Sequence, residues 1–381
     1  MSIYLDAAAT TKVKPQVVEA MMPYFTDKFH NPSALYSNAN KIKEDITKSR
    51  ETVGSFINAD GSEIFFTSSG SEANNWAIQG FANYWSNKGR CVSVITSTIE
   101  HKSIISCVDY FDGVDVHYID VDNEGFIDMK ALRDILFYTT QMMENETLVS
   151  IQYANNEIGT IQNIKEITKL CHRYGALFHV DAVQALGQIP IDVKELDVDM
   201  LSASGHKIGA PKGIGFLYKK NFVQINPLIY GSQMDGLRGG TENIAYIIGM
   251  AKAVELIQKD YQNQIKLSVL RNNFINELKA LGCKINGSLS ERLPNNINAT
   301  FSQNITGEAL VYLLDMCGIM VATGSACNSH EIKPSYVLKA IGLGDEEVAK
   351  TLRFTLSEDI TMEEIDNVVC ELKKQIQLLE A

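Results

Sequence analysis

The chain has 381 residues, of which 45% are hydrophobic and 21% carry a charge, a balance typical of a soluble globular enzyme with room for two domains. Its formal net charge of -12 argues against general binding to nucleic acid or to an anionic membrane. No apolar run approaches the ~18 residues of a membrane span, and residues 1–6 lack the segments of a signal peptide, so we expect a cytoplasmic protein.

The first stretch with a chemical signature follows a short predicted strand at 63–66. Residues 67–75 are small and polar and open a predicted helix, with Gly70 and Ser71 at its start. A helix N-terminus of this kind offers free backbone N–H groups and a favourable dipole to a phosphate, and Ser71 adds a hydroxyl. An ordinary serine N-cap is the alternative interpretation of the same residues.

Three further predicted strands are each followed by a polar side chain. Strand 92–96 leads to His101, strand 149–153 to Asn155, and the buried strand 176–180 to Asp181. The carboxyl ends of parallel strands meet at one edge of a sheet, where α/β proteins bind their ligands. Taken singly, each side chain has a plain explanation, since most lone histidines are structural and an Asp after a strand often caps a helix.

Lys207 ends a loop of small residues, Ser202–Lys207, that lies between two apolar runs. Small residues leave room for a bulky ring, and a buried Lys with a lowered pKa can form a Schiff base with an aldehyde. A solvated loop lysine is the alternative. Asp181 favours the Schiff-base lysine over the solvated one. A carboxylate beside a bound pyridine keeps the ring nitrogen protonated, as pyridoxal phosphate (PLP) chemistry requires.

Asp181, then Gln184, then Ser-x-His-Lys in this order resembles the fold-type-I PLP enzymes, specifically their class V aminotransferase branch. The resemblance implies an α/β fold, with a mostly parallel central sheet flanked by helices and a smaller α+β C-terminal domain. It implies an N-terminal arm, 1–14, that packs with the small domain, then a large PLP-binding domain, 15–256, and a small domain, 257–381.

The same resemblance assigns roles to the polar side chains. Lys207 becomes the cofactor lysine, and His101 stacks on the pyridine ring and transfers protons. The expected cofactor-binding residues are Gly70, Ser71, His101, Asn155, Asp181, Gln184, Ser204, His206, Lys207 and Thr241. Thr241 enters through the stretch Arg238–Asn243, which in the family reaches the phosphate of the neighbouring subunit, so a homodimer is expected.

Seven cysteines are spread along the chain, at positions 91, 107, 171, 283, 317, 327 and 370. Their number is odd and none form a C-x-x-C pair, so we expect reduced thiols and no metal site. A small buried hydrophobic residue is the simplest interpretation for six of them.

Cys327 is the exception, because it lies among small and polar residues in the stretch 321–330. Such a loop suits an accessible, reactive thiol, whereas an incidental loop cysteine is the alternative. Gly-Ser-Ala-Cys, followed by Pro-Ser-Tyr-Val-Leu at 334–338, resembles the cysteine desulfurases of the nitrogen-fixation and iron–sulfur-cluster type. The similarity runs from Tyr4 to about Ile365.

This second resemblance implies the reaction. L-Cysteine would become L-alanine, and its sulfur would pass to Cys327 as a persulfide for delivery to an acceptor protein in iron–sulfur-cluster assembly or in tRNA or DNA thiolation. Lys207 and His101 would move protons. Arg353, on a predicted strand at 352–356, offers the planar fork that binds a carboxylate, and Asn155 would assist it.

Two alternatives stay open from the sequence. One is another class V aminotransferase or lyase in which Cys327 is incidental, and the other is a catalytically silent sulfur-transfer or scaffold protein that keeps the fold. The chain also departs from the family pattern at His30, at Tyr36 and at Ser357-Glu358-Asp359. These positions concern the substrate entrance and the surface near Arg353.

Overall fold

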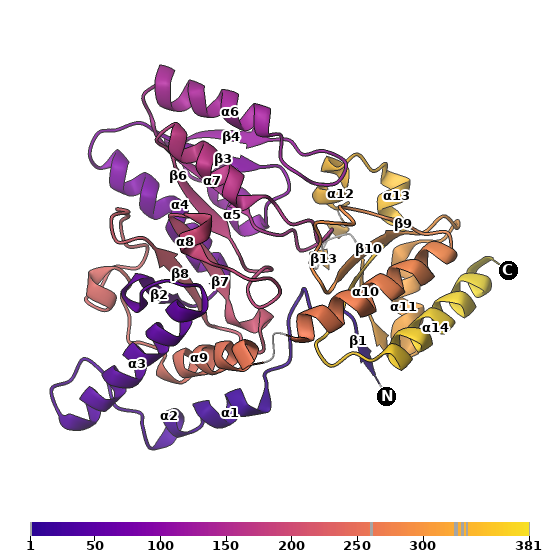
Figure 1. Ribbon diagram of the computed structural model, residues 1–381, viewed down its shortest axis with the longest axis horizontal. Coiled ribbons are helices and arrows are strands. Elements are labelled where there is room, and N and C mark those ends of the chain that lie inside the picture. The colour runs from indigo at the N-terminus through magenta and orange to yellow at the C-terminus, as the bar shows by residue number, and fades with distance from the viewer. Residues whose placement is uncertain (1, 260–261, 324–326, 329–330, 333, 381) are drawn as a thin grey trace.

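The computed structural model describes residues 2–259, 262–323, 327–328, 331–332 and 334–380. The chain forms a larger body around one wide sheet and a smaller body beside it, and both are visible in Figure 1. The C-terminus belongs to the smaller body, and so does the first strand of the chain.

The larger body is organised around a seven-stranded sheet. Its spatial order is β2 (Ile64–Thr67), β8 (Gly215–Lys219), β7 (Met200–Ser204), β6 (Leu177–Asp181), β5 (Glu146–Gln152), β3 (Val92–Ser97) and β4 (Asp115–Ile119). Only β8 runs antiparallel to its neighbours. The carboxyl ends of β2, β3, β5, β6 and β7 therefore lie at one edge, which is where the sequence places its polar candidates.

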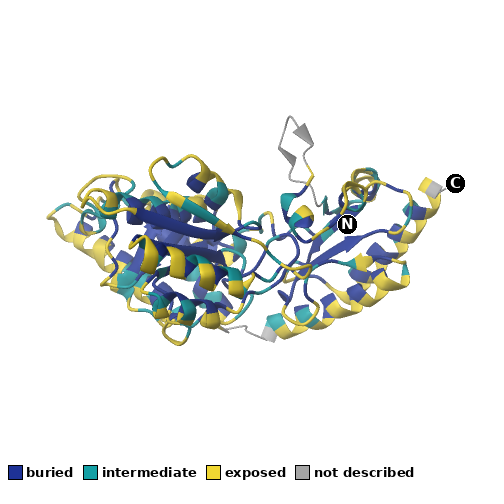
Figure 2. Cartoon of the chain, turned by 90° about the horizontal axis from the view of Figure 1, so that it is seen from above, coloured by how far each residue is buried: buried dark blue, intermediate teal, exposed yellow. Residues whose placement is uncertain are grey.

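Helices cover both faces of this sheet, because successive strand residues point to opposite faces. On β2, Phe65 packs with α4 (Gly70–Ser86) and α5 (Lys102–Asp109), whereas Ile64 and Phe66 join the core on the other face. That second core is completed by α1 (Pro15–Met21), α3 (Ser37–Phe56), α6 (Met129–Phe137), α7 (Ile164–Arg173), α8 (Val193–Leu196) and α9 (Ile244–Lys259). Figure 2 shows the buried strands between helices whose outer sides are exposed.

The smaller body has an antiparallel sheet in the order β12 (Ala322–Thr323), β15 (Thr351–Thr355), β10 (Asn296–Thr300) and β9 (Lys284–Ile285). Its helices are α10 (Gln262–Ala280), α11 (Gly307–Met316), α12 (Tyr336–Ala340), α13 (Asp345–Ala349) and α14 (Met362–Glu380). At its edge β1 (Ile3–Tyr4) pairs in parallel with β11 (Ile319–Met320). A further antiparallel pair joins β13 (Cys327–Asn328) to β14 (Glu331–Ile332).

Short segments complete the fold. They are α2 (Pro23–Thr26), the 3-10 turns η1 (Gly61–Glu63), η3 (Gly205–Lys207) and η4 (Met234–Gly236), and a π-helical turn η2 (Tyr138–Met142). Among the described residues, no helix is both long and apolar enough to cross a membrane.

The α/β fold with a mostly parallel central sheet is confirmed, and the predicted strands lie within a few residues of the observed ones. The helices α9 and α10 follow each other in the chain, with residues 260–261 outside the described part. A separate core in the smaller body joins Phe274 of α10 to Leu5 of the N-terminal arm. We propose the division into 1–14, 15–256 and 257–381 on the basis of these separate cores.

Candidate functional site

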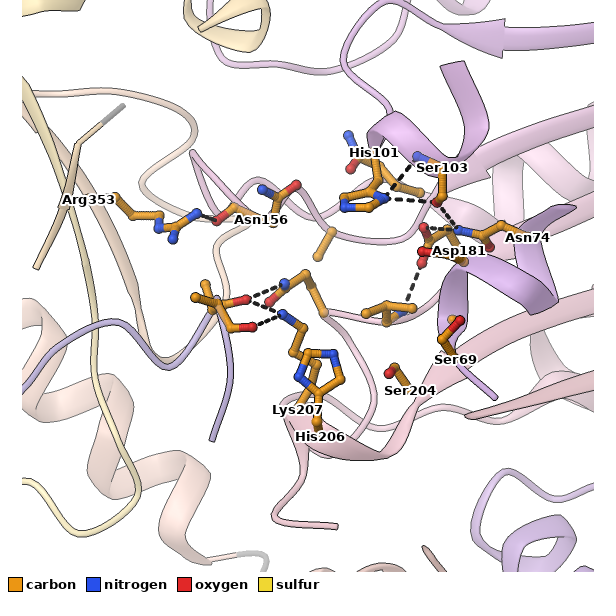
Figure 3. Close-up of a pocket in the computed structure, with 18 residues that line it drawn as sticks. Ser69, Asn74, His101, Ser103, Asn156, Asp181, Ser204, His206, Lys207 and Arg353 are labelled. Carbon is orange, nitrogen blue, oxygen red and sulfur yellow. Dashed lines mark hydrogen bonds between the residues drawn. The ribbon is translucent and has the colours of Figure 1, made fainter. Parts of the chain in front are cut away.

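A cavity of about 360 Å³ opens at the carboxyl edge of the sheet, between the two bodies and under the N-terminal arm (Figure 3). Of the residues expected from the sequence, its walls include Gly70, Ser71, His101, Asp181, Gln184, Ser204, His206, Lys207 and Arg353. The residues that follow strands of the large sheet thus meet at one place, as the carboxyl-edge rule predicts, and Arg353 joins them from the smaller body.

The N-terminus of α4 forms one end of the cavity. Ser69 caps the helix, and its hydroxyl accepts a hydrogen bond from the Glu72 N–H at 3.1 Å. A Cβ atom on Gly70 would lie 2.6 Å from Cγ2 of Val183, so only glycine lets the helix begin this close to the cavity wall. Ser69 and Ser204 lie beside each other at this end in Figure 3. The positive helix end and the hydroxyls suit an anion.

Asp181 ends β6 and is 5% exposed. Its Oδ2 accepts a hydrogen bond from Asn74 Nδ2 at 2.7 Å, and its Oδ1 accepts one from the Val183 N–H at 2.9 Å. Asn74 also donates to Ser103 Oγ, while its own Oδ1 is buried without a partner among the described residues. The carboxylate is therefore fixed in orientation at the cavity wall by groups of the larger body.

His101 caps α5 and presents its ring to the same cavity. Ring Nδ1 lies 2.8 Å from Ser103 Oγ and 3.1 Å from the Ser103 nitrogen, so Ser103 holds this side of the ring. Although solvent reaches the ring through the cavity, desolvation lowers the pKa of His101; Lys207 and Lys102 act in the same direction and Asp181 opposes them. The imidazole is thus neutral near pH 7 and able to accept a proton.

Lys207 lies in η3, directly after β7. Its Nζ donates to the carbonyl oxygens of Ala8 and, at 2.8 Å, Ala9 in the N-terminal arm. Burial, with a contribution from the nearby Arg353 charge, lowers the pKa of Lys207 to about 8, against the opposing effects of two carboxylates. About a tenth of such an amine is neutral at pH 7, far more than for a free lysine.

Arg353 reaches the cavity from β15 of the smaller body. Its Nη2 forms an ion pair with Asp6 Oδ1 at 2.6 Å, and its Nη1 donates to the Asn156 carbonyl at 3.4 Å. Its Nε–H is buried and has no partner among the described residues. Because Arg353 lines the cavity, its guanidinium can exchange the Asp6 carboxylate for that of a ligand.

Asn155 does not reach the cavity in this structure. It is fully buried, its Oδ1 accepts the N–H groups of Glu157 and Ile158, and its Nδ2 donates to the Ile99 carbonyl. The neighbouring Asn156 lines the cavity instead. Two adjacent asparagines follow the strand, and the sequence does not show which of them turns outward.

Two expected residues remain, Thr241 and Cys327. Thr241 is exposed and does not line the cavity. Cys327 pairs with Ile332 through the backbone of β13 and β14, but its side chain lies outside the described part of the structure, as do residues 324–326. Of the other cysteines, 107, 171 and 283 are buried and 91, 317 and 370 are exposed, so the expectation of burial is wrong for three of the six.

The departures at His30 and Tyr36 form a small aromatic group away from the cavity. His30 stacks on Phe29 with ring centroids 4.6 Å apart and meets Tyr36 edge-on at 5.9 Å. Glu358 forms an ion pair with Lys14 at 2.7 Å. Among the residues that the structure describes, no cluster of three or more His, Cys, Asp or Glu side chains is arranged to hold a metal ion.

Known proteins are similar to this chain in sequence and in fold. A family model described as aminotransferase class-V matches residues 3–368. The chain is 45% identical to cysteine desulfurase IscS of Clostridium botulinum, over 98% of this chain and 94% of that protein. Among solved structures, a NifS-like protein has a TM-score of 0.90 at 34% identity and full coverage of both chains. The structure of SspA in complex with cysteine has a TM-score of 0.81 at 34% identity, covering 93% and 99% of the two chains.

Proposed function

The chain belongs to the cysteine desulfurases of the class-V aminotransferase family, and we propose that its cavity binds PLP and L-cysteine and that Cys327 accepts the substrate sulfur. The observation that carries this proposal is the placement of Lys207, Asp181 and His101 around one cavity with a helix N-terminus at its end. Each alone has a plain explanation, but their convergence matches the donor set of a PLP site.

The residues fit the cofactor. We propose that Gly70, Ser71, Ser204 and His206 hold the phosphate at the start of α4, because they supply hydroxyl, imidazole and backbone N–H donors there. Thr241, exposed in the single chain, would complete the phosphate site of a second copy in a homodimer. When bound, PLP supplies an aldehyde for the lysine and an electron sink for the substrate carbon.

Asp181 and Gln184 would face the ring. The Asp181 carboxylate is oriented by two hydrogen bonds and can hold a proton on the ring nitrogen. Gln184 lines the cavity and donates to the Ala8 carbonyl, which leaves its other polar groups for the ring oxygen. We propose Asn156 for the contact that the sequence suggests for Asn155, with Asn155 holding the backbone of that loop.

The substrate would be fixed by its carboxylate on the Arg353 guanidinium, which lines the cavity. Lys207, with a pKa of about 8, can take the proton from the substrate Cα and return it. His101 is neutral near pH 7 and can accept the proton of the substrate thiol. Each of these side chains thus moves or holds one proton or one charge.

The sulfur balance needs no external oxidant. L-Cysteine and the Cys327 thiol give L-alanine and a Cys327 persulfide, so one C–S bond breaks as one S–S bond forms. We propose that the persulfide is then passed to an acceptor protein, either an iron–sulfur scaffold or a thiolation enzyme.

A single-turnover experiment tests this function. The protein loaded with PLP and given one equivalent of L-cysteine should yield alanine, and mass spectrometry should find one added sulfur on the peptide that contains Cys327. Cys327→Ser should still bind PLP and cysteine but form no persulfide, whereas Cys91→Ser, which changes an exposed thiol, should behave as the unmodified protein. Added sulfur on a different cysteine would contradict the proposal.

A further inference from the structure

An internal ion pair lies directly beside the proposed phosphate site. Glu72, in the first turn of α4, accepts hydrogen bonds from Arg238 Nε at 2.9 Å on Oε1 and from Arg238 Nη2 at 3.2 Å on Oε2. The two side chains are only 11% and 19% exposed. This two-bond fork is the strongest arrangement that a guanidinium makes with a carboxylate, and shielding from water keeps it effective.

Glu72 is a negative charge one residue after Ser71. Burial alone would raise its pKa, but the hydrogen bonds from Arg238 and from the Ser68 N–H, the latter at 2.7 Å, outweigh burial and hold the pKa below its usual value. The carboxylate is therefore ionised at every pH at which the enzyme would bind PLP. Without a counter-charge it would repel a phosphate at the same helix end.

Arg238 lies in a loop whose two ends, residues 229–231 and Gly239, contact each other. The Gly239 N–H donates to the Ile229 carbonyl at 2.8 Å. A side chain at Gly231 or at Gly239 would collide with the backbone of the opposite loop end. The loop therefore presents Arg238 to α4 from a fixed base. Thr241, the residue expected to reach a second copy, follows three positions later.

Arg238 makes its hydrogen bonds to protein groups outside the cavity. Nε and Nη2 are used by Glu72, Nη1 donates to the Gly239 carbonyl at 3.3 Å, and the side chain does not line the cavity. We propose that Arg238 is a positioning residue that neutralises Glu72 and so keeps the first turn of α4 attractive to the PLP phosphate. This inference rests on the proposed function, because it needs the phosphate at that helix end.

A double-mutant cycle on the apo-protein tests the proposal, with the dissociation constant for PLP as the readout. Arg238→Gln should weaken PLP binding by about tenfold, because it leaves the Glu72 charge unpaired. Glu72→Gln should change the constant by no more than about twofold, and the double variant should return to within about threefold of the original protein. Arg238→Lys, which keeps the charge, should lie between the original protein and Arg238→Gln.

Pyridoxal without its phosphate is the matched control ligand, and it should bind all four variants and the original protein alike. A double variant that binds PLP as weakly as Arg238→Gln would overturn the proposal, because Arg238 would then act independently of Glu72. An unchanged constant in Arg238→Gln would do the same. If the original protein binds no PLP, the proposed function itself fails, whereas PLP binding without the rescue pattern removes only this inference.

Discussion

The two walls of the cavity are held together in different ways. On the strand-end wall, Asp181 and His101 are oriented by Asn74, Val183 and Ser103, all from the larger body. On the opposite wall, the two cations are held by the N-terminal arm. Lys207 donates to the carbonyls of Ala8 and Ala9, and Arg353 pairs with Asp6.

This difference separates groups that stay in place from groups that change partner. The hydrogen bonds of the strand-end wall join residues of the larger body to one another, so we expect them to persist when a ligand enters. The arm contacts involve the atoms that the ligand needs, since Lys207 Nζ must meet an aldehyde and the Arg353 guanidinium must meet a carboxylate. The arm therefore stabilises both cations in the ligand-free chain, and ligand binding has to replace these contacts.

The largest expected effect comes from Lys207→Ala. The variant should lose covalent capture of PLP and all measurable turnover, because none of the other side chains on the described cavity walls is a lysine. Borohydride reduction followed by peptide mass spectrometry locates the attached cofactor. Lys212→Ala, which changes a nearby exposed lysine, is the control and should keep the adduct. A cofactor adduct on any lysine other than 207 would refute the assignment.

Arg353→Lys tests the two-donor guanidinium on the wall that the N-terminal arm contacts, which we call the arm-held wall. The charge stays, but the planar pair of donors is lost, so kcat/KM for L-cysteine should fall by roughly tenfold or more, about 1.4 kcal/mol. The affinity for PLP should not change, because Arg353 lies at the other side of the cavity from Ser69 and Ser204. Steady-state kinetics with a parallel cofactor titration separates the two. An unchanged kcat/KM would remove Arg353 from the substrate site.

The pH dependence of cofactor capture probes the Lys207 side of the same wall. The pKa of Lys207 is lowered to about 8, so the amine is protonated below that pH and free to react above it. The rate of PLP capture by the apo-protein should therefore rise with pH and reach half its maximum near pH 8, instead of near the ~10.4 of an ordinary lysine. Stopped-flow absorbance at a series of pH values measures this.

The charges near Lys207 predict how the pH midpoint of PLP capture should shift in two control variants. Arg353 lowers the pKa of Lys207 and Asp6 raises it, after the larger effect of burial. Arg353→Gln should therefore move the midpoint to higher pH, and Asp6→Asn should move it to lower pH. Midpoints that do not respond to either substitution would show that the neighbouring charges have no influence on Lys207.

The strand-end wall could be predicted from the sequence, and the arm-held wall only in part. Asp181 and His101 follow apolar strands, so the topology of a parallel sheet is enough to bring them together. Gly70 and Ser71 carry the signature of a helix N-terminus. These features depend on local pattern and on one general rule about sheets.

The contacts that were missed depend on tertiary packing. Asp6 and Arg353 are separated by 347 residues, and no local pattern pairs a carboxylate at one end of a chain with an arginine at the other. Asn74 lies one helical turn after Gly70 and so faces the same side, a signal that was available in the sequence. The choice between Asn155 and Asn156 is set by which amide the loop backbone needs for its own hydrogen bonds.

The smallest expected effect, and the most direct test of partner exchange, comes from Asp6→Asn. In the ligand-free chain, the Asp6 carboxylate occupies Arg353 Nη2 at 2.6 Å, with side-chain exposures of 24% and 13%. A substrate carboxylate that approaches the same guanidinium meets this negative charge. Asparagine keeps the shape and an oxygen acceptor but removes the charge, so KM for L-cysteine should fall by about threefold, the size expected for a partly exposed ion pair.

The values of kcat and KM show whether Asp6 competes with the substrate for Arg353 or holds Arg353 in its productive orientation. If Asp6 only competes with the substrate, kcat should stay unchanged while KM falls, provided that both are measured well above pH 8, where Lys207 is neutral with or without Asp6. Glu358→Gln breaks the other ion pair that ties the arm region to the smaller body, the one with Lys14, and should leave both constants unchanged. A rise in KM for Asp6→Asn would instead mean that Asp6 holds Arg353 in its productive orientation. The arm would then belong with the strand-end wall as a permanent support, and the distinction between the two walls would fail.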